Sequence, residues 1–184
     1  MSISSAHGAG APSAWVMRFA PQIAVGGRVL DLACGRGRHS RALGARGCVV
    51  VAADRDGAAL ADLAAVVGVT PCQVDLENGT PWPWAEASFD AVVVTNYLFR
   101  PGFAALCALL RPGGVLIYET FMLGNARFGK PSNPDFLLAP GELLQLTADA
   151  FTPLAFEQGE VRAPAPAMVQ RLCAIRGEAT GLIG

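Results

Sequence analysis

The chain has 184 residues, a formal net charge of −1 and 52% hydrophobic residues. This length is most simply one domain with a sizeable buried core. The near-neutral charge argues against nucleic acid as a partner, because proteins that bind it usually carry a basic excess or stripe. No apolar run approaches the roughly 18–20 residues that cross a bilayer, and the first residues lack the apolar core of a secretory signal. We therefore expect no membrane partner, a cytoplasmic location, a flexible lead-in over 1–12 and a single domain over 13–184, as a monomer or homodimer.

Helical patterns and valine-rich runs alternate along most of the chain. We expect helices over 13–19, 40–45, 57–67, 101–110 and 142–148, and strands over 28–33, 48–53, 70–74, 89–95 and 115–121. Two further strand-like runs, 153–161 and 167–177, follow each other without a helix, which favours an antiparallel hairpin at the sheet edge. The fold class expected is α/β: a seven-stranded, mostly parallel, doubly wound sheet with a C-terminal antiparallel hairpin and helices on both faces.

The five cysteines show no Cys-x-x-Cys spacing, and His7 and His39 are the only histidines. Scattered cysteines in apolar stretches are typical of buried free thiols. With so few ligand-type side chains, we expect no metal site.

The segment VLDLACGRGRHSRAL, residues 29–43, joins the first expected strand to a helix through Gly35 and Gly37. Such a loop lets a ligand approach the backbone and the amides at the start of the helix. Ser40 stands where a dinucleotide-binding G-x-G-x-x-G would have its third glycine, and Asp31 precedes the glycines. The segment alone fits a nicotinamide site, an ordinary tight turn or a loop for another nucleotide-like ligand.

Polar side chains follow several of the expected strands. Asp54 ends the second strand, Asp75 the third, Asn96 and Tyr97 follow the fourth, and Glu119 lies near the end of the fifth. Open α/β sheets bind ligands at the carboxyl ends of their strands, and an acid about 20 residues beyond the glycines can accept hydrogen bonds from ribose. A turn or helix-capping role remains the alternative for Asp54 and Asp75.

Together these motifs resemble class I S-adenosylmethionine-dependent methyltransferases, whose first strand ends in approximately [DE]-x-G-x-G-x-G. Here the motif is Asp31-Leu32-Ala33-Cys34-Gly35-Arg36-Gly37, with Ala33 in place of the first glycine. The acids after strands 2 and 3, the Arg111-Pro112-Gly113-Gly114 turn and the final hairpin are similar too. The small size resembles the bacterial tellurite- and thiopurine-modifying members.

The resemblance implies that S-adenosylmethionine is the cofactor. Ala33, Gly35 and Gly37 would pass under its methionine and ribose portion, and Asp31 would face its amino group. Asp54 would hold the ribose hydroxyls with Arg55 beside it, and Asp75 and Leu76 would contact adenine. Asn96 and Tyr97 would border the transferred methyl, and Arg18 is the candidate for the cofactor carboxylate. These expected cofactor residues are Arg18, Asp31, Ala33, Gly35, Gly37, Asp54, Arg55, Asp75, Leu76, Asn96 and Tyr97.

The methyl acceptor is left open by the fold. Thr95-Asn96-Tyr97-Leu98 lacks the proline pair that amino-methylating nucleic-acid enzymes often carry, so we expect a small-molecule acceptor. The long stretch over 122–141 is the expected specificity loop, with Arg127, Phe128 and Asn133 as substrate candidates, although a solvated connector is the alternative. Candidates for a general base are Tyr97, Glu119 and His39.

Two other functions fit the same sequence less well. An NAD(P)-dependent oxidoreductase would use Asp54 equally, but it leaves Asp75 without a role and Ser40 breaks its fingerprint. A non-catalytic protein that only binds S-adenosylmethionine would retain the same cofactor residues.

Overall fold

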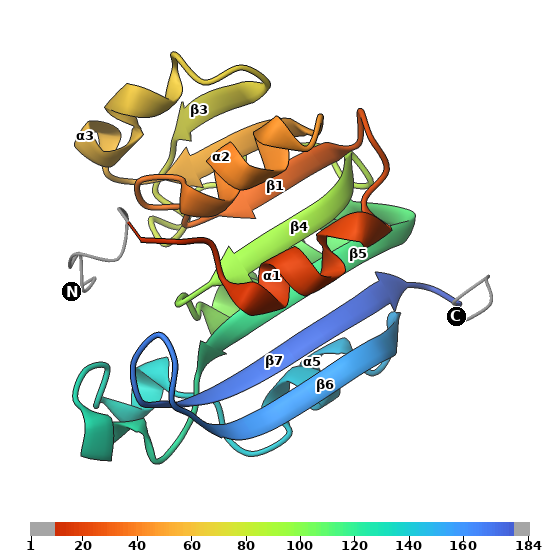
Figure 1. Cartoon of the computed structure of the whole chain (residues 1–184). Coiled ribbons are helices and arrows are strands. Elements are labelled where there is room, and N and C mark those ends of the chain that lie inside the picture. The colour runs from red at the N-terminus through yellow and green to blue at the C-terminus, as the bar shows by residue number, and fades with distance from the viewer. Residues whose placement is uncertain (1–9, 179–184) are drawn as a thin grey trace.

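The computed structural model describes residues 10–178, so that most of the expected lead-in lies outside the described residues. Seven strands form one sheet in the order β3-β2-β1-β4-β5-β7-β6 (Figure 1). The strands are β1 (Arg28–Leu32), β2 (Val49–Asp54), β3 (Val69–Gln73), β4 (Phe89–Thr95), β5 (Leu110–Phe121), β6 (Phe151–Val161) and β7 (Ala167–Arg176). The first five run parallel, whereas β7 pairs antiparallel with both β5 and β6. The expected sheet and its C-terminal hairpin are therefore confirmed.

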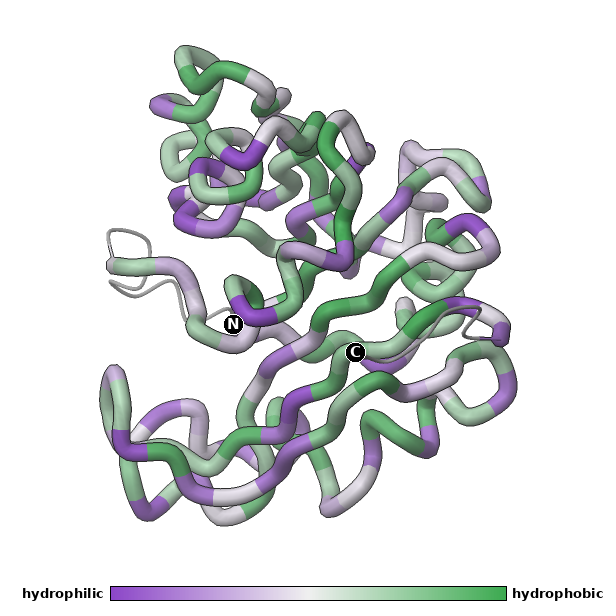
Figure 2. The backbone as a smooth tube through the Cα atoms, turned by 45° about the vertical axis from the view of Figure 1, so that its right-hand side comes forward, coloured by the Kyte–Doolittle hydropathy of each residue, from purple (hydrophilic) through white to green (hydrophobic). Residues whose placement is uncertain are grey.

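Helices cover both faces of this sheet (Figure 1). The α-helices are α1 (Ala14–Phe19), α2 (Arg38–Ala45), α3 (Gly57–Leu60), α4 (Phe103–Leu109) and α5 (Glu142–Thr147). Short 3-10 turns are η2 (Ala20–Gln22), η3 (Ala61–Leu63), η4 (Arg100–Gly102), η5 (Asn125–Phe128) and η6 (Pro134–Phe136). One apolar core lies between the sheet and α1, α2 and α3, and a second between the sheet and α4 and α5. The central strands are correspondingly apolar along their length (Figure 2), as strands buried on both faces are.

The helix expected over 57–67 is shorter in the structure. It continues as η3 only to Leu63, and the chain then turns toward β3. Leu63 is fully buried, whereas Val67 is 90% exposed. Because alanine-rich helices need tertiary packing to persist, the helix ends where its last buried contact ends.

The Arg111–Gly114 turn is included in β5 rather than preceding it. It interrupts the pairing with β4, where Phe89 faces Leu110 but Ala91 already faces Val115. Gly113 has φ +78°, a left-handed conformation that glycine adopts without a steric penalty. The turn is thus an irregularity inside the strand.

Candidate functional site

The chain between β1 and α2 has three residues in the left-handed region. Ala33, Gly35 and Gly37 have φ of 54°, 56° and 70°. A side chain added to Gly35 would meet nothing within 4 Å, whereas one added to Gly37 would come within 2.6 Å of the Leu63 methyls. Gly35 therefore keeps space open above the loop, and Gly37 lets η3 pack against it. The sequence does not distinguish these two requirements.

Asp31 is buried beside this loop with one carboxylate oxygen satisfied. Ser40 donates a 2.5 Å hydrogen bond to Asp31 Oδ2, while Oδ1 has no hydrogen-bond partner within residues 10–178. Burial raises the pKa of Asp31 from 3.8 to about 6, against the lowering effects of the Ser40 hydrogen bonds and Arg38. Ser40, which breaks the dinucleotide fingerprint, is thus the partner of the motif's acid.

The raised pKa of Asp31 predicts a pH-dependent stability. As pH rises from 3.8 to about 6, the unfolded carboxyl loses its proton before the folded one, so ionisation of Asp31 lowers the free energy of unfolding across this range. The difference between the two pKa values corresponds to about 3 kcal/mol. Asp31→Asn should therefore gain up to about 3 kcal/mol relative to the wild type between pH ~4 and ~7, measured by urea unfolding. The exposed-site variant Asp62→Asn is the control, and an Asp31→Asn difference that is constant over this range would contradict the expectation.

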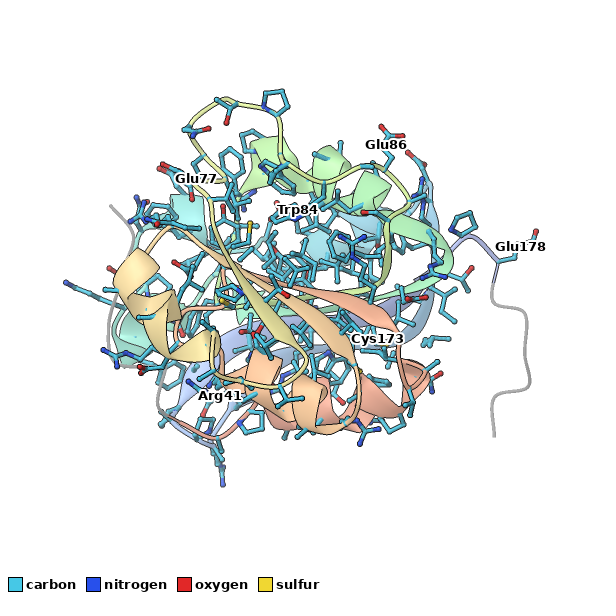
Figure 3. The ribbon with its side chains drawn as sticks, turned by 90° about the horizontal axis from the view of Figure 1, so that it is seen from above. Arg41, Glu77, Trp84, Glu86, Cys173 and Glu178 are labelled. Carbon is cyan, nitrogen blue, oxygen red and sulfur yellow. The ribbon has the colours of Figure 1, made fainter. Side chains whose placement is uncertain are left out.

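Two further acids lie at the carboxyl ends of β2 and β3. Asp54 Oδ2 accepts a 2.8 Å hydrogen bond from the Gly35 N–H, and its Oδ1 accepts from the Asp56 N–H at 2.9 Å. Asp75 Oδ1 accepts a hydrogen bond from the Glu77 N–H at 3.0 Å, and this bond closes a turn. A cleft joins the ends of these strands to the glycine loop, and it is lined by Ala33, Asp54, Arg55, Val74, Asp75, Leu76, Glu77 and Tyr97. The Glu77 side chain is exposed and also lies at this edge of the sheet (Figure 3).

Asn96 and Tyr97 follow β4 next to this cleft. The Asn96 N–H donates to the Glu119 carbonyl at 2.9 Å, and the Tyr118 hydroxyl donates to the Tyr97 carbonyl at 2.8 Å. These bonds fix the backbone after β4 to β5. The Tyr97 hydroxyl is buried with no partner in the described part of the chain, and burial together with the nearby Glu77 carboxylate raises its pKa well above the usual value. Tyr97 therefore keeps its proton near neutral pH and can donate a hydrogen bond.

The other two expected bases are already engaged in hydrogen bonds. His39 is 1% exposed, its Nε2 accepts from the Ser13 N–H at 3.0 Å, and its Nδ1 lies 3.4 Å from Thr95 Oγ1. Burial lowers the pKa of His39 to about 3, so the ring is neutral. Glu119 accepts from Ser13 Oγ at 2.8 Å and pairs with Arg171 Nε at 2.5 Å. A base role for His39 or Glu119 stays a prediction that needs these contacts to open.

Arg18 does not lie with the glycine loop. It pairs with Glu157 of β6 at 3.0 Å and lies over the rings of Trp15 and Phe19. β6 is the outer strand on the far side of β5 from β1. The prediction that Arg18 contacts the cofactor carboxylate would require this exposed ion pair to open.

The segment over 122–141 is fixed to the rest of the fold by hydrogen bonds at several points. Asn125 is buried, donates to the Pro131 carbonyl at 3.0 Å and accepts from the Met168 N–H at 3.0 Å. Arg100 donates to the Asp135 and Leu137 carbonyls at 2.7 and 2.8 Å and pairs with Glu142 at 2.5 Å. These contacts fix both halves of the segment.

The three expected substrate residues lie on this segment. Arg127 pairs with Glu160 of β6 at 2.7 Å and lies 4.6 Å from the Phe128 ring centroid. Asn133 accepts from the Asp135 N–H at 3.1 Å and caps η6. The structure thus brings Arg127 and Phe128 together, while Asn133 shapes the loop nearby.

The described residues contain no cluster of three or more His, Cys, Asp or Glu side chains that could hold a metal ion. All five cysteines are free thiols, and Cys34, Cys48 and Cys173 are buried. None of the helices between residues 10 and 178 is both long and apolar enough to span a membrane.

Comparison with known proteins shows that the site is similar to methyltransferases. A family model described as "Methyltransferase domain" matches residues 29–114, which span the glycine loop, both acids and β4. A demethylmenaquinone methyltransferase of Clavibacter sepedonicus is 36% identical over 102 residues, which are 52% of this chain and 42% of that protein. Residues 29–114 are therefore similar to a methyltransferase domain. The whole chain has the fold of solved S-adenosylmethionine-dependent methyltransferases.

Solved methyltransferase structures share the fold of this chain. TehB from Haemophilus influenzae is 20% identical with a TM-score of 0.75, and the match covers 90% of this chain and 63% of that chain. A geranyl diphosphate C-methyltransferase from Streptomyces coelicolor A3(2), solved with Mg²⁺, geranyl diphosphate and S-adenosyl-L-homocysteine, is 17% identical with a TM-score of 0.67. That match covers 89% of this chain and 78% of the other. The chain thus spans less than half of the curated relative and under two thirds of TehB.

Proposed function

We propose that this chain transfers a methyl group from S-adenosylmethionine to a small-molecule acceptor and releases S-adenosylhomocysteine. The observation that carries the proposal is the buried Asp31 Oδ1, which has no hydrogen-bond partner among residues 10–178 and lies beside the loop where Gly35 leaves open space. A buried carboxylate oxygen without a partner is costly unless a ligand completes its hydrogen bonding. The amino group of the cofactor is a suitable donor for it.

The residues around the cleft fit the rest of the cofactor. Asp54 and Asp75 each present a carboxylate at a strand end, the first suited to ribose hydroxyls and the second to the adenine amine. Ala33 and Leu76 supply apolar surface between them, Arg55 lies at the rim, and Asn96 and Tyr97 border the methyl end. Gly37 contributes indirectly by packing on Leu63. Arg18 is left out of this proposed site because it pairs with Glu157.

S-adenosylmethionine supplies a methyl group that is already activated for in-line displacement. The protein's task is then to align two reactants, which can contribute on the order of 7–11 kcal/mol to the barrier. A base is needed only for an acceptor that arrives protonated. His39 and Glu119 are occupied and Tyr97 holds its proton, so the site favours an acceptor that is deprotonated or soft on arrival, such as a thiolate or an oxyanion.

Small acceptors also agree with two relatives, whose names refer to demethylmenaquinone and geranyl diphosphate. A screen for S-adenosylhomocysteine release tests the acceptor class directly. Tellurite, a thiopurine, a naphthohydroquinone, an oligonucleotide and a simple amine form the panel. Turnover of tellurite or of the thiopurine supports an acceptor that is deprotonated or soft on arrival. Turnover confined to the oligonucleotide or the amine would contradict this acceptor class.

The ion pair between Arg127 and Glu160 predicts that a substitution at Arg127 lowers turnover of the acceptor. Arg127→Ala should release the loop from β6 and lower kcat/KM for the acceptor by about tenfold, because a small misplacement of a reactant is costly. The dissociation constant for S-adenosylhomocysteine should stay unchanged. Arg46→Ala, an exposed site at the end of α2, is the control. Equal losses of turnover and cofactor affinity would mean that the loop covers the cofactor instead.

A further inference from the structure

Residues Gly10–Ser13, which we call the strap, precede α1 and pass beside the carboxyl ends of β1 and β4 (Figure 1). The strap contacts the first turn of α2 at two points. Arg38 donates to the Ala11 carbonyl at 3.4 Å, and the Ser13 N–H donates to His39 Nε2 at 3.0 Å. It also reaches β5, because Ser13 Oγ donates to Glu119 Oε1 at 2.8 Å. The strap therefore connects the helix after the glycine loop with the far side of β4.

Ser13 carries most of this connection. Its N–H and its hydroxyl both donate, and the same hydroxyl oxygen accepts from the Trp15 N–H at 3.1 Å to cap α1. The partners lie 26 and 106 residues away in the sequence. The backbone N–H and the side chain of this one residue thus fix the start of α1 to two otherwise separate elements.

The partners of Ser13 are themselves held in place. His39 is buried, with its other ring nitrogen facing Thr95 at the end of β4. Glu119 pairs with Arg171 of β7, and its backbone carbonyl accepts from the Asn96 N–H. Because His39 and Glu119 are both held by other residues, they would not move with Ser13 if the strap moved. Their hydrogen bonds therefore favour the strap position described above.

We propose that the strap closes the methyl-transfer end of the cofactor cleft and that Ser13 is the positioning residue that holds it closed. This inference rests on the proposed function. The strap connects α2, which begins directly after Gly37 of the cofactor loop, with Glu119. The Glu119 carbonyl holds the N–H of Asn96, which borders the methyl end in that proposal. His39 and Glu119 then act on the reaction through Ser13, as positioning residues that hold the closed wall.

Substitutions at Ser13 separate this role from helix capping. Ser13→Ala removes both the cap and the hydrogen bond to Glu119. Ser13→Asp keeps a good helix cap but places a second carboxylate against Glu119. Ser13→Thr keeps a hydroxyl for both contacts. Arg46→Ala is the control, because it changes an exposed charge at the far end of α2 without touching the strap.

The measurement is the rate of S-adenosylhomocysteine release, followed by stopped-flow tryptophan fluorescence, with thermal melting recorded for each variant. Release from Ser13→Ala and Ser13→Asp should be at least about fivefold faster than from the wild type, as expected for one lost hydrogen bond. Ser13→Thr and Arg46→Ala should release the ligand at the wild-type rate.

A wild-type release rate in Ser13→Asp would show that Ser13 only caps α1, and it would overturn the proposal. An unchanged rate in Ser13→Ala would overturn it as well. In both cases S-adenosylhomocysteine still binds, so the proposed function stands. If the wild-type protein itself does not bind S-adenosylhomocysteine, the proposed function fails and the strap proposal fails with it.

Discussion

Gly37→Ala is expected to lower the free energy of unfolding by about 2–4 kcal/mol. Gly37 has φ +70°, and a side chain there would come within 2.6 Å of both Leu63 methyl groups. Leu63 is fully buried and cannot move aside without disturbing the core around it. The cost of an alanine in the left-handed region and the cost of its clash with Leu63 therefore both lower the free energy of unfolding. Urea unfolding of the variant and the wild type measures the difference.

Gly35→Ala and Gly113→Ala are matched to this variant. Both positions have positive φ, and neither would place a side chain within 4 Å of another atom. Each should cost only about 1–2 kcal/mol for its backbone. Gly35→Ala should in addition lose S-adenosylhomocysteine binding, because its methyl enters the proposed cofactor space, whereas Gly113→Ala should bind normally. If Gly35→Ala binds as tightly as Gly113→Ala, the space above Gly35 is not the ligand's.

Asp54→Ala is expected to weaken S-adenosylhomocysteine binding by at least about 1.5 kcal/mol, which is more than tenfold in the dissociation constant. In the proposed site the variant removes the acceptor of both ribose hydroxyls. It also removes the acceptor of the Gly35 and Asp56 N–H groups, which loosens the loop itself. Calorimetric titration of the variant and the wild type measures the loss.

Asp62→Ala is the control for this result, because Asp62 is an exposed acid of η3 whose carboxylate has no hydrogen bond among the described residues. Asp54→Asn, which retains one oxygen acceptor, should fall between Asp54→Ala and the wild type. Unchanged affinity in Asp54→Ala would remove Asp54 from the proposed site.

The fold could be predicted from the sequence where local pattern and burial agree. The run FDAVVVT forms β4 over Phe89–Thr95, because a continuous apolar run suits a strand buried on both faces. The helix beginning at Gly57 was predicted too long, since its end depends on Leu63 reaching Gly37 across the fold. Burial in the tertiary structure, rather than alanine content, decides where that helix ends.

For the site, the sequence predicts the positions of residues along the strands but not their hydrogen-bond partners. Asp54, Asp75 and Tyr97, which line one cleft, were predictable as neighbours because each follows a strand and the carboxyl ends of parallel strands meet at one edge of the sheet. The partner of each side chain was not predictable. Ser40 bonds to Asp31 across the loop, Ser13 reaches Glu119, and Arg18 turns to Glu157. These contacts depend on how α1 and α2 lie on the sheet, which no local pattern in the sequence specifies.

The most direct test of the proposed function is calorimetric titration of the unmodified protein with S-adenosylhomocysteine and, separately, with NADH. We predict saturable one-to-one binding of S-adenosylhomocysteine and none of NADH. Binding of NADH without binding of S-adenosylhomocysteine would contradict the cofactor site proposed around Asp31, Gly35 and Asp54.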